Sequence, residues 1–233
     1  MRTGRTVVFL WLAGGLIAAC AAAQEKPAGY RDELRLIESQ QRRKRYQECV
    51  AMCEKMLARF KEAWQVKEVT WLKIENLILD SQYEAALKVL ADLSGAYGED
   101  KPLQTAAGLR TGDVQRMLKR FDDAVATYRK LAAGCAKDQP DQAADALLRA
   151  GEVLCSDLKK PEKGIAIYRD LESSLGAQEP RRAAEALRRA AAAHESQTKD
   201  AAKAADDYLA LTAKYASVYD ESTLSGLHDK AMD

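Results

Sequence analysis

The sequence predicts an all-α protein, an α-solenoid of about five helix–turn–helix repeats followed by a C-terminal capping helix. First, the C-terminal half repeats itself: residues 140–175 align with residues 180–215 at a shift of forty positions. Second, apolar residues within each repeat recur at helical spacing, and no segment alternates as a half-buried strand does. A period of this length indicates helical units that bury their apolar faces by stacking on their neighbours.

Residues 1–23 are expected to be a secretory signal peptide. Arg2 and Arg5 precede an uncharged, largely apolar stretch over 7–19, and small residues follow it. The apolar run is shorter than the roughly 20 residues of a membrane-spanning helix, so an uncleaved anchor is the less favoured alternative. A short linker over 24–29 then leads into the repeats, which we expect to occupy 30–233.

The end of the signal peptide allows two interpretations. Residues 17–20, Ile-Ala-Ala-Cys, resemble the bacterial lipobox, in which the cysteine is lipidated and becomes the mature N-terminus. Residues 21–23 before Gln24 resemble an ordinary signal-peptidase site instead. We favour lipidation of Cys20, which predicts an exported lipoprotein of the periplasm or outer membrane, with a soluble periplasmic protein as the alternative.

The four remaining cysteines are expected to be small buried thiols at helix contacts. Cys49 and Cys53 are four residues apart on one predicted helix, where their side chains are poorly directed for a disulfide. Further ligands at metal spacing are missing around all four, so we expect no zinc site. Whether any of them forms a disulfide stays open at this stage. The other two cysteines of this set are Cys135 and Cys155.

The limits of the predicted helices are inferred from residues that recur at equivalent positions in successive repeats. Aromatic residues open the second helix of the early repeats at intervals of 37 and 38 residues, and a tyrosine and a leucine recur every forty residues in the later ones. These positions are Tyr46, Tyr83 and Phe121, then Tyr128, Tyr168 and Tyr208, and Leu131, Leu171 and Leu211. The predicted helix pairs are 30–60, 64–97, 102–134, 140–175 and 180–215, with a capping helix over 219–230.

Prolines and glycines mark the predicted boundaries. Proline is tolerated in the first turn of a helix, and the residues before these prolines are poor N-caps, so frayed starts are expected. The prolines concerned are Pro102, Pro140, Pro161 and Pro180. Three glycines, Gly95, Gly134 and Gly176, are expected to end second helices in the left-handed conformation.

Small residues are expected where helices cross closely, with the repeated tyrosines filling the space beside them. They are Gly112, Ala124, Gly151, Gly164 and Ala204. The fourth repeat, which contains Gly151 and Gly164, carries one extra residue in its turn.

One repeat resembles the tetratricopeptide family. Gly112 precedes Ala124 by twelve residues, and Tyr128 follows four residues later, as the small, alanine and aromatic positions do in that family. The resemblance implies a helical array that binds a protein or peptide partner in its concave groove. The length, the early cysteine and the five repeats are also similar to bacterial envelope members, of the β-barrel assembly lipoprotein and Tol–Pal accessory types.

Composition argues against nucleic-acid binding and against catalysis. Lys and Arg number 36 against 35 Asp and Glu, so no net positive charge favours nucleic acid. We find no phosphate loop, nucleophile elbow or paired-cysteine metal motif, and therefore expect no enzyme activity, cofactor or metal. The two histidines, His194 and His228, are expected to lie at the surface or in packing contacts.

Residues 42–45, Arg-Arg-Lys-Arg, form the strongest local concentration of charge. A solvated turn between two helices is the simpler interpretation. The alternative is contact with anionic lipid headgroups, because a lipid anchor at Cys20 would bring these residues near a membrane.

The first helices of the repeats are expected to line the concave, partner-binding face. Trp71 is the favoured anchor of that site, and core packing between the first two repeats is its alternative. The other expected site residues are Glu75, Asp113, Arg116, Glu152, Arg188 and Glu195. The sequence thus predicts a non-catalytic, exported and lipid-anchored interaction scaffold, or alternatively a structural subunit of an obligate envelope assembly complex.

Overall fold

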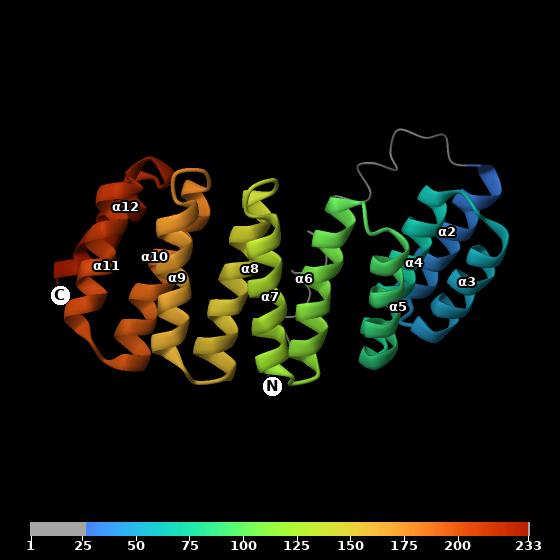
Figure 1. The fold of residues 1–233 in the computed structure, drawn as a ribbon, viewed down its shortest axis with the longest axis horizontal. Coiled ribbons are helices and arrows are strands. Elements are labelled where there is room, and N and C mark those ends of the chain that lie inside the picture. Colours follow the sequence, from blue (N-terminus) through green and yellow to red (C-terminus); the bar gives the residue numbers. More distant parts are fainter. Residues whose placement is uncertain (1–26, 233) are drawn as a thin grey trace. The chain divides into compact units, whose positions relative to one another are not determined.

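The computed structural model describes residues 27–232, and every regular element in that range is a helix (Figure 1). The signal peptide and the lipidation site at Cys20 lie outside the described residues, so both stay predictions. No helix in the described range is long and apolar enough to cross a membrane.

The chain divides into two compact units, the first ending at Leu118 and the second beginning at Lys119. In each unit, every helix packs against the next one along the chain. The first unit contains α2 (Ala28–Arg42), α3 (Tyr46–Arg59), α4 (Ala63–Leu79), α5 (Tyr83–Ala96) and α6 (Lys101–Met117). The second contains α7 (Phe121–Cys135), α8 (Pro140–Glu152), α9 (Pro161–Leu175), α10 (Pro180–Ala193), α11 (Ala201–Lys214) and α12 (Glu221–Met232).

The all-α repeat fold is confirmed, and each predicted helix pair agrees with the structure to within two residues. The third pair is divided between the units, since α6 ends the first and α7 begins the second. Three short turns complete the second unit. They are the π-helical turns η2 (Val153–Asp157) and η3 (His194–Thr198) and the 3₁₀ turn η4 (Ala216–Val218).

The left-handed residues lie between the first and second helices of the repeats, and none is a glycine. They are Lys44, Ser81, Lys119, Lys159 and Lys199, with φ angles from 55° to 60°. The expectation for Gly95, Gly134 and Gly176 is therefore wrong: the first two lie inside helices, and Gly176 is right-handed. The left-handed residue is needed where the chain reverses within a few residues, which is the turn inside a repeat.

Removing the steric strain of a non-glycine residue at positive φ should stabilise the second unit. Lys159→Gly or Lys199→Gly is expected to raise the free energy of unfolding by about 0.5–1 kcal/mol, because glycine has no Cβ to clash at positive φ. Lys130→Gly, on an exposed position inside α7, is the matched control and should lower it by about 1 kcal/mol. Urea denaturation followed by circular dichroism measures both, and a loss of stability at Lys159 and Lys199 would contradict the φ assignment.

Several helix starts carry side-chain caps, among them those of α6, α11 and α12, the last through Asp220 and the backbone N–H of Thr223. Asp100 accepts a hydrogen bond from the backbone N–H of Leu103 at 3.1 Å, and Asp200 accepts one from Lys203 at 3.1 Å. The frayed start expected for α6 is therefore wrong, because that helix begins one residue before Pro102 and Asp100 caps it. The prolines of α8, α9 and α10 do lie in first turns, and these three helices lack a side-chain cap.

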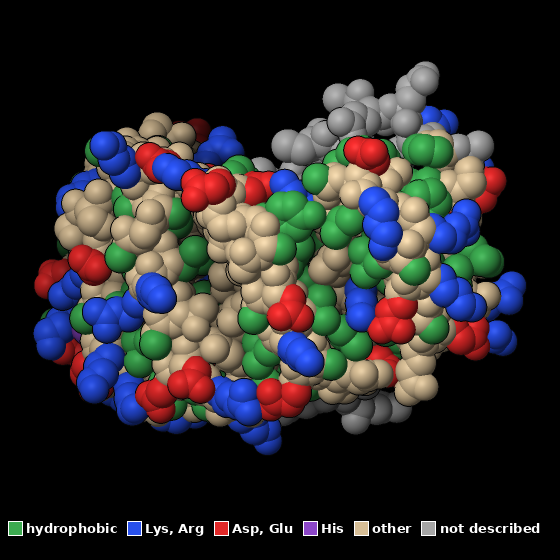
Figure 2. All heavy atoms as spheres, turned by 45° about the vertical axis from the view of Figure 1, so that its right-hand side comes forward, with side chains coloured by type: hydrophobic (Ala, Val, Ile, Leu, Met, Phe, Trp, Pro, Cys, Tyr) green, Lys and Arg blue, Asp and Glu red, His purple; other side chains and the backbone are tan. Residues whose placement is uncertain are grey.

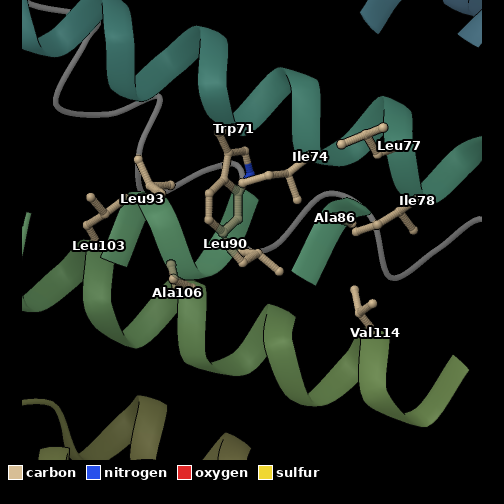
Figure 3. Packing of buried hydrophobic residues seen from close by; sticks show 11 residues of the cluster. Trp71, Ile74, Leu77, Ile78, Ala86, Leu90, Leu93, Leu103, Ala106 and Val114 are labelled. Atoms are coloured by element: carbon tan, nitrogen blue, oxygen red, sulfur yellow. The ribbon is translucent and has the colours of Figure 1, made fainter. Parts of the chain in front are cut away.

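In the first unit, α4, α5 and α6 enclose one apolar core and α2, α3 and α4 enclose another. Trp71 of α4 points into the core between α4, α5 and α6, where it lies with Ile74, Leu90 and Leu93 (Figure 3). In the core between α2, α3 and α4, the ring of Tyr30 contacts Phe60 edge-on, with 4.9 Å between the ring centroids.

In the second unit Tyr168 fills the close crossing of α8 and α9, as predicted, and the other two repeat tyrosines are also buried. Tyr128, Tyr168 and Tyr208 are at most 3% exposed. A Cβ added at Gly151 would lie 2.4 Å from the Tyr168 ring, and one at Gly164 would lie 2.2 Å from the Cys155 sulfur. Only glycine therefore lets α8 and α9 approach this closely.

The four described cysteines are buried and free, which confirms the thiol interpretation. Burial raises the pKa of each thiol, in the case of Cys53 to about 12. These thiols therefore stay protonated and poorly reactive at neutral pH.

Candidate functional site: a pocket between two π-helical turns

The second unit contains an open pocket of about 330 Å³. One wall comes from the end of α8 and from η2, with Glu152, Cys155 and Ser156. The opposite wall comes from α10 and η3, with Arg188 and Arg189 among its residues. The lining also includes Tyr168 of α9, Ala192, Ala193, Ser196 and Gln197. This volume is at the lower end for ligand pockets and suits one or two side chains of a partner.

The two π-helical turns explain why the pocket forms in these repeats. The last two repeats have a period of forty residues, against 37 and 38 earlier, and an inserted residue in a helix is commonly accommodated as a π-helical turn. Each turn directly continues a first helix, so η2 brings Ser156 and η3 brings Ser196 and Gln197 to the pocket. The sequence revealed the extra residue of the fourth repeat, but not that it would widen the helix.

The charged groups of the pocket are paired with one another. Arg189 donates to Glu152 at 3.1 Å and to Glu185 at 2.7 Å. Arg188 donates to the same Glu185 through two nitrogens, at 2.7 and 2.8 Å. Burial opposes ionisation of Glu185, but these hydrogen bonds outweigh it and lower the pKa of that carboxyl. The arginines are thus held in place while the Arg188 side chain stays 48% exposed.

The pocket combines an exposed guanidinium with apolar groups. Ala192, Ala193 and the Tyr168 ring provide the apolar part, and the Cys155 thiol lies beside them. Burial raises the pKa of this thiol and the nearby Glu152 adds to the effect, so Cys155 is poorly suited to act as a nucleophile. This chemistry suits binding of a peptide side chain better than a covalent reaction.

Three predicted site residues belong to this region. Glu152 and Arg188 line the pocket, on the first helices of adjacent repeats as expected. Glu195 lies in η3 and accepts a hydrogen bond from the Tyr208 hydroxyl at 3.2 Å.

A buried pair attaches η3 to α11. His194 is 6% exposed and its Nε2 lies 3.7 Å from an Asp207 carboxylate oxygen, while Arg169 donates to the other oxygen at 2.9 Å. His194 therefore has a packing role, as expected, and His228 is exposed. No group of three or more His, Cys, Asp or Glu residues in the described part of the chain could hold a metal ion.

Trp71 is 5% exposed, so the expectation that it is an exposed anchor is wrong. It packs in a core as the alternative proposed, but mainly between the second and third repeats and not between the first two. Helix α4 packs against both α3 and α5, and the indole lies on the side covered by α5 and α6. Helical periodicity showed that Trp71 lies on an apolar face, but not which helices cover that face.

Two of the charged residues predicted in the first unit, Glu75 and Asp113, meet around Arg110, which the sequence analysis did not select. The Arg110 guanidinium is 6% exposed; it pairs with Glu75 and lies 3.8 Å from Asp113. Burial raises the pKa of Glu75, an effect that Arg110 partly offsets. Glu75 is thus held in a buried ion pair, and Arg116 lies further along α6 in its last turn.

The tetratricopeptide repeat family matches residues 106–133 of the chain. The match covers most of α6 and α7 and includes the small, alanine and aromatic positions on which the resemblance rests. A search of curated proteins found no match to the chain. Residues 106–133 are therefore similar to a tetratricopeptide repeat, within a chain whose described part is built from helix–turn–helix units throughout.

Proposed function

We propose that this protein is a non-catalytic interaction scaffold, exported and lipid-anchored at Cys20, which binds a segment of a partner protein in the pocket between η2 and η3. The observation that carries the proposal is the pocket itself. It lies between the first helices of two adjacent repeats and combines an exposed guanidinium with apolar walls. Tetratricopeptide repeats generally mediate protein–protein interaction, which supports the same assignment.

The lining favours an acidic residue next to a small apolar one in the partner segment. Two arginines and one glutamate line the pocket, and Arg188 is the more exposed of the two arginines. A partner carboxylate could accept hydrogen bonds from its guanidinium, while a neighbouring apolar side chain covers Ala192 and Ala193. The fixed position of Arg188 reduces the entropy lost on binding.

The binding test compares two arginines of α10. Arg188→Ala should weaken binding of the partner by about 5- to 30-fold, or about 1–2 kcal/mol. Arg181→Ala removes the same charge from the same helix at an exposed position outside the pocket, and should change the affinity less than twofold. The partner is first identified by photo-crosslinking from position 197 in cells, with position 206 of α11 as the control. Equal effects of both alanine variants would remove the pocket from the interface.

Export and anchoring are tested separately. The wild-type protein should incorporate labelled palmitate, and Cys20→Ala should abolish the label. An unlabelled mature protein that begins at Gln24 would instead establish a soluble periplasmic form.

The alternative is a structural subunit of an obligate envelope assembly complex. The five predicted pairs, found here as successive helices, and the early cysteine favour it, because envelope lipoproteins of this type share both. An obligate subunit should co-purify with a stoichiometric partner after mild detergent extraction, whereas a transient scaffold should be recovered mostly alone.

A further inference from the structure

The first described helix, α2, has one side without a packing partner among the described residues. Tyr30 and Ile37 on its inner side are fully buried in the core with α3 and α4. On its outer side, Arg31 and Arg35 are exposed, and Leu36 is 50% exposed, which is unusual for a large apolar side chain of this protein.

Positive charge continues from this side into the turn after the helix. Residues 42–45 are four consecutive exposed cations, and left-handed Lys44 lies among them. Figure 2 shows Lys and Arg side chains on the right-hand part of the surface, with Asp and Glu side chains among them. We call Arg31, Arg35, Leu36 and residues 42–45 the basic stripe.

The acidic residues nearby offset only part of the positive charge of the basic stripe. Over residues 31–45 there are six Arg and Lys against three Asp and Glu. Arg35 lies 3.7 Å from Asp32 and Arg42 lies 3.8 Å from Glu38, with all four side chains at least 60% exposed. Arg45 lies 3.5 Å from Glu48 in one further exposed pair. Exposed pairs at such distances contribute little, so these arginines can turn toward another anion.

The position of the stripe in the chain determines which anion it can reach. Six residues lie between Cys20 and Pro27, so the seven steps from one to the other can span at most about 25 Å, while the fifteen-residue α2 is about 22 Å long. An acyl chain on Cys20 would therefore hold residues 42–45 within about 47 Å of the anchor, near enough for them to reach the bilayer surface. Exposed leucine beside arginines is the composition of helices that lie at the lipid headgroup level.

We propose that the basic stripe docks on an anionic lipid surface and so provides a second membrane contact beside the anchor at Cys20. This inference rests on the proposed export and anchoring for its setting, but its binding energy comes from residues 31–45 alone. Each Lys or Arg near an anionic surface raises the partition coefficient about fivefold, so the four cations of the turn account for several hundredfold. The contact would orient the repeats relative to the membrane, which one flexible anchor cannot do.

The test uses the processed, unlipidated chain of residues 24–233, which contains every described residue, with vesicles of phosphatidylcholine alone or with about one-third phosphatidylglycerol. The wild type should sediment with the anionic vesicles only, and less so at high salt. Changing residues 42–45 to glutamine should lower its partition coefficient at least fiftyfold. The control changes Lys130, Lys137, Lys163 and Arg181 to glutamine, which removes the same charge from exposed sites of the second unit. It should lower the coefficient less than fivefold.

Equal sedimentation with both vesicle types, or equal losses in both variants, would overturn the proposal. Circular dichroism of each variant verifies that the helices are retained. The palmitate label reports on the anchor independently. A wild type without label whose unlipidated chain still binds phosphatidylglycerol would refute the anchor and leave the basic stripe supported. A labelled wild type without this binding would refute the stripe alone.

Discussion

Replacing Tyr168 with alanine is expected to lower the free energy of unfolding of the second unit by about 3–5 kcal/mol. The side chain is 2% exposed and fills the space where α8 crosses α9, so its removal leaves a cavity. Circular dichroism in urea measures the loss. The described tryptophans, Trp64 and Trp71, both belong to the first unit, so their fluorescence reports that unit separately.

A double-mutant cycle with Gly151 identifies what fills that space. Gly151→Ala alone should cost about 1–3 kcal/mol, because its Cβ would lie 2.4–2.8 Å from three atoms of the Tyr168 ring. In the Tyr168→Ala background those atoms are gone, and the same change should stabilise the protein by about 1 kcal/mol through helix propensity. Additive effects would show that the ring does not lie against Gly151. Gly134→Ala in α7 is the control; it has open space around it and should be stabilising.

The fold was predictable because each repeat solves the same packing problem. Tyr128, Tyr168 and Tyr208 recur at equal spacing, and all three are buried. The left-handed turns were not predictable in the same way. Their φ angle follows from how tightly the chain must reverse. Lysine has no preference for positive φ, so the residue type at positions such as Lys159 and Lys199 does not indicate this conformation.

The candidate site was predictable only in part, for a related reason. Two of the residues predicted on the first helices, Glu152 and Arg188, do line the candidate pocket, and their role in binding stays a prediction. The prediction of Trp71 as an exposed anchor was wrong because a periodic pattern identifies an apolar face without showing how many helices cover it. Glu75 was selected as an open charge because its partner Arg110 lies 35 residues away, on a helix whose register no local pattern determines.

Replacing Arg110 with alanine is expected to lower the free energy of unfolding of the first unit by about 3–5 kcal/mol, because it leaves the Glu75 carboxylate buried without its partner. Trp71 lies in the core bounded by α4, α5 and α6. Glu75 belongs to α4 and Arg110 to α6, so both partners lie on helices that enclose this core. The fluorescence of Trp71 in urea therefore reports this loss directly, while the far-UV signal of the second unit should be retained.

The dependence of this loss on pH distinguishes an unpaired charge from lost packing. Burial already raises the pKa of Glu75, and without Arg110 that pKa should rise further, because the group that lowers it is gone. A carboxyl whose pKa is higher in the folded than in the unfolded state binds more protons when folded, so stability falls as pH rises between the two values. Arg110→Ala should therefore be less destabilising at pH 5 than at pH 8.

The matched control removes both charges. Glu75→Leu combined with Arg110→Met fills similar volume without a buried ion. This double variant should regain most of the lost stability, and its stability should no longer show the pH dependence of Arg110→Ala. A loss that is the same at both pH values, and that the double variant does not recover, would mean that Arg110 acts through the packing of its aliphatic stem. In that case the guanidinium would be dispensable, and Glu75 would be a protonated or solvated carboxyl in the native protein.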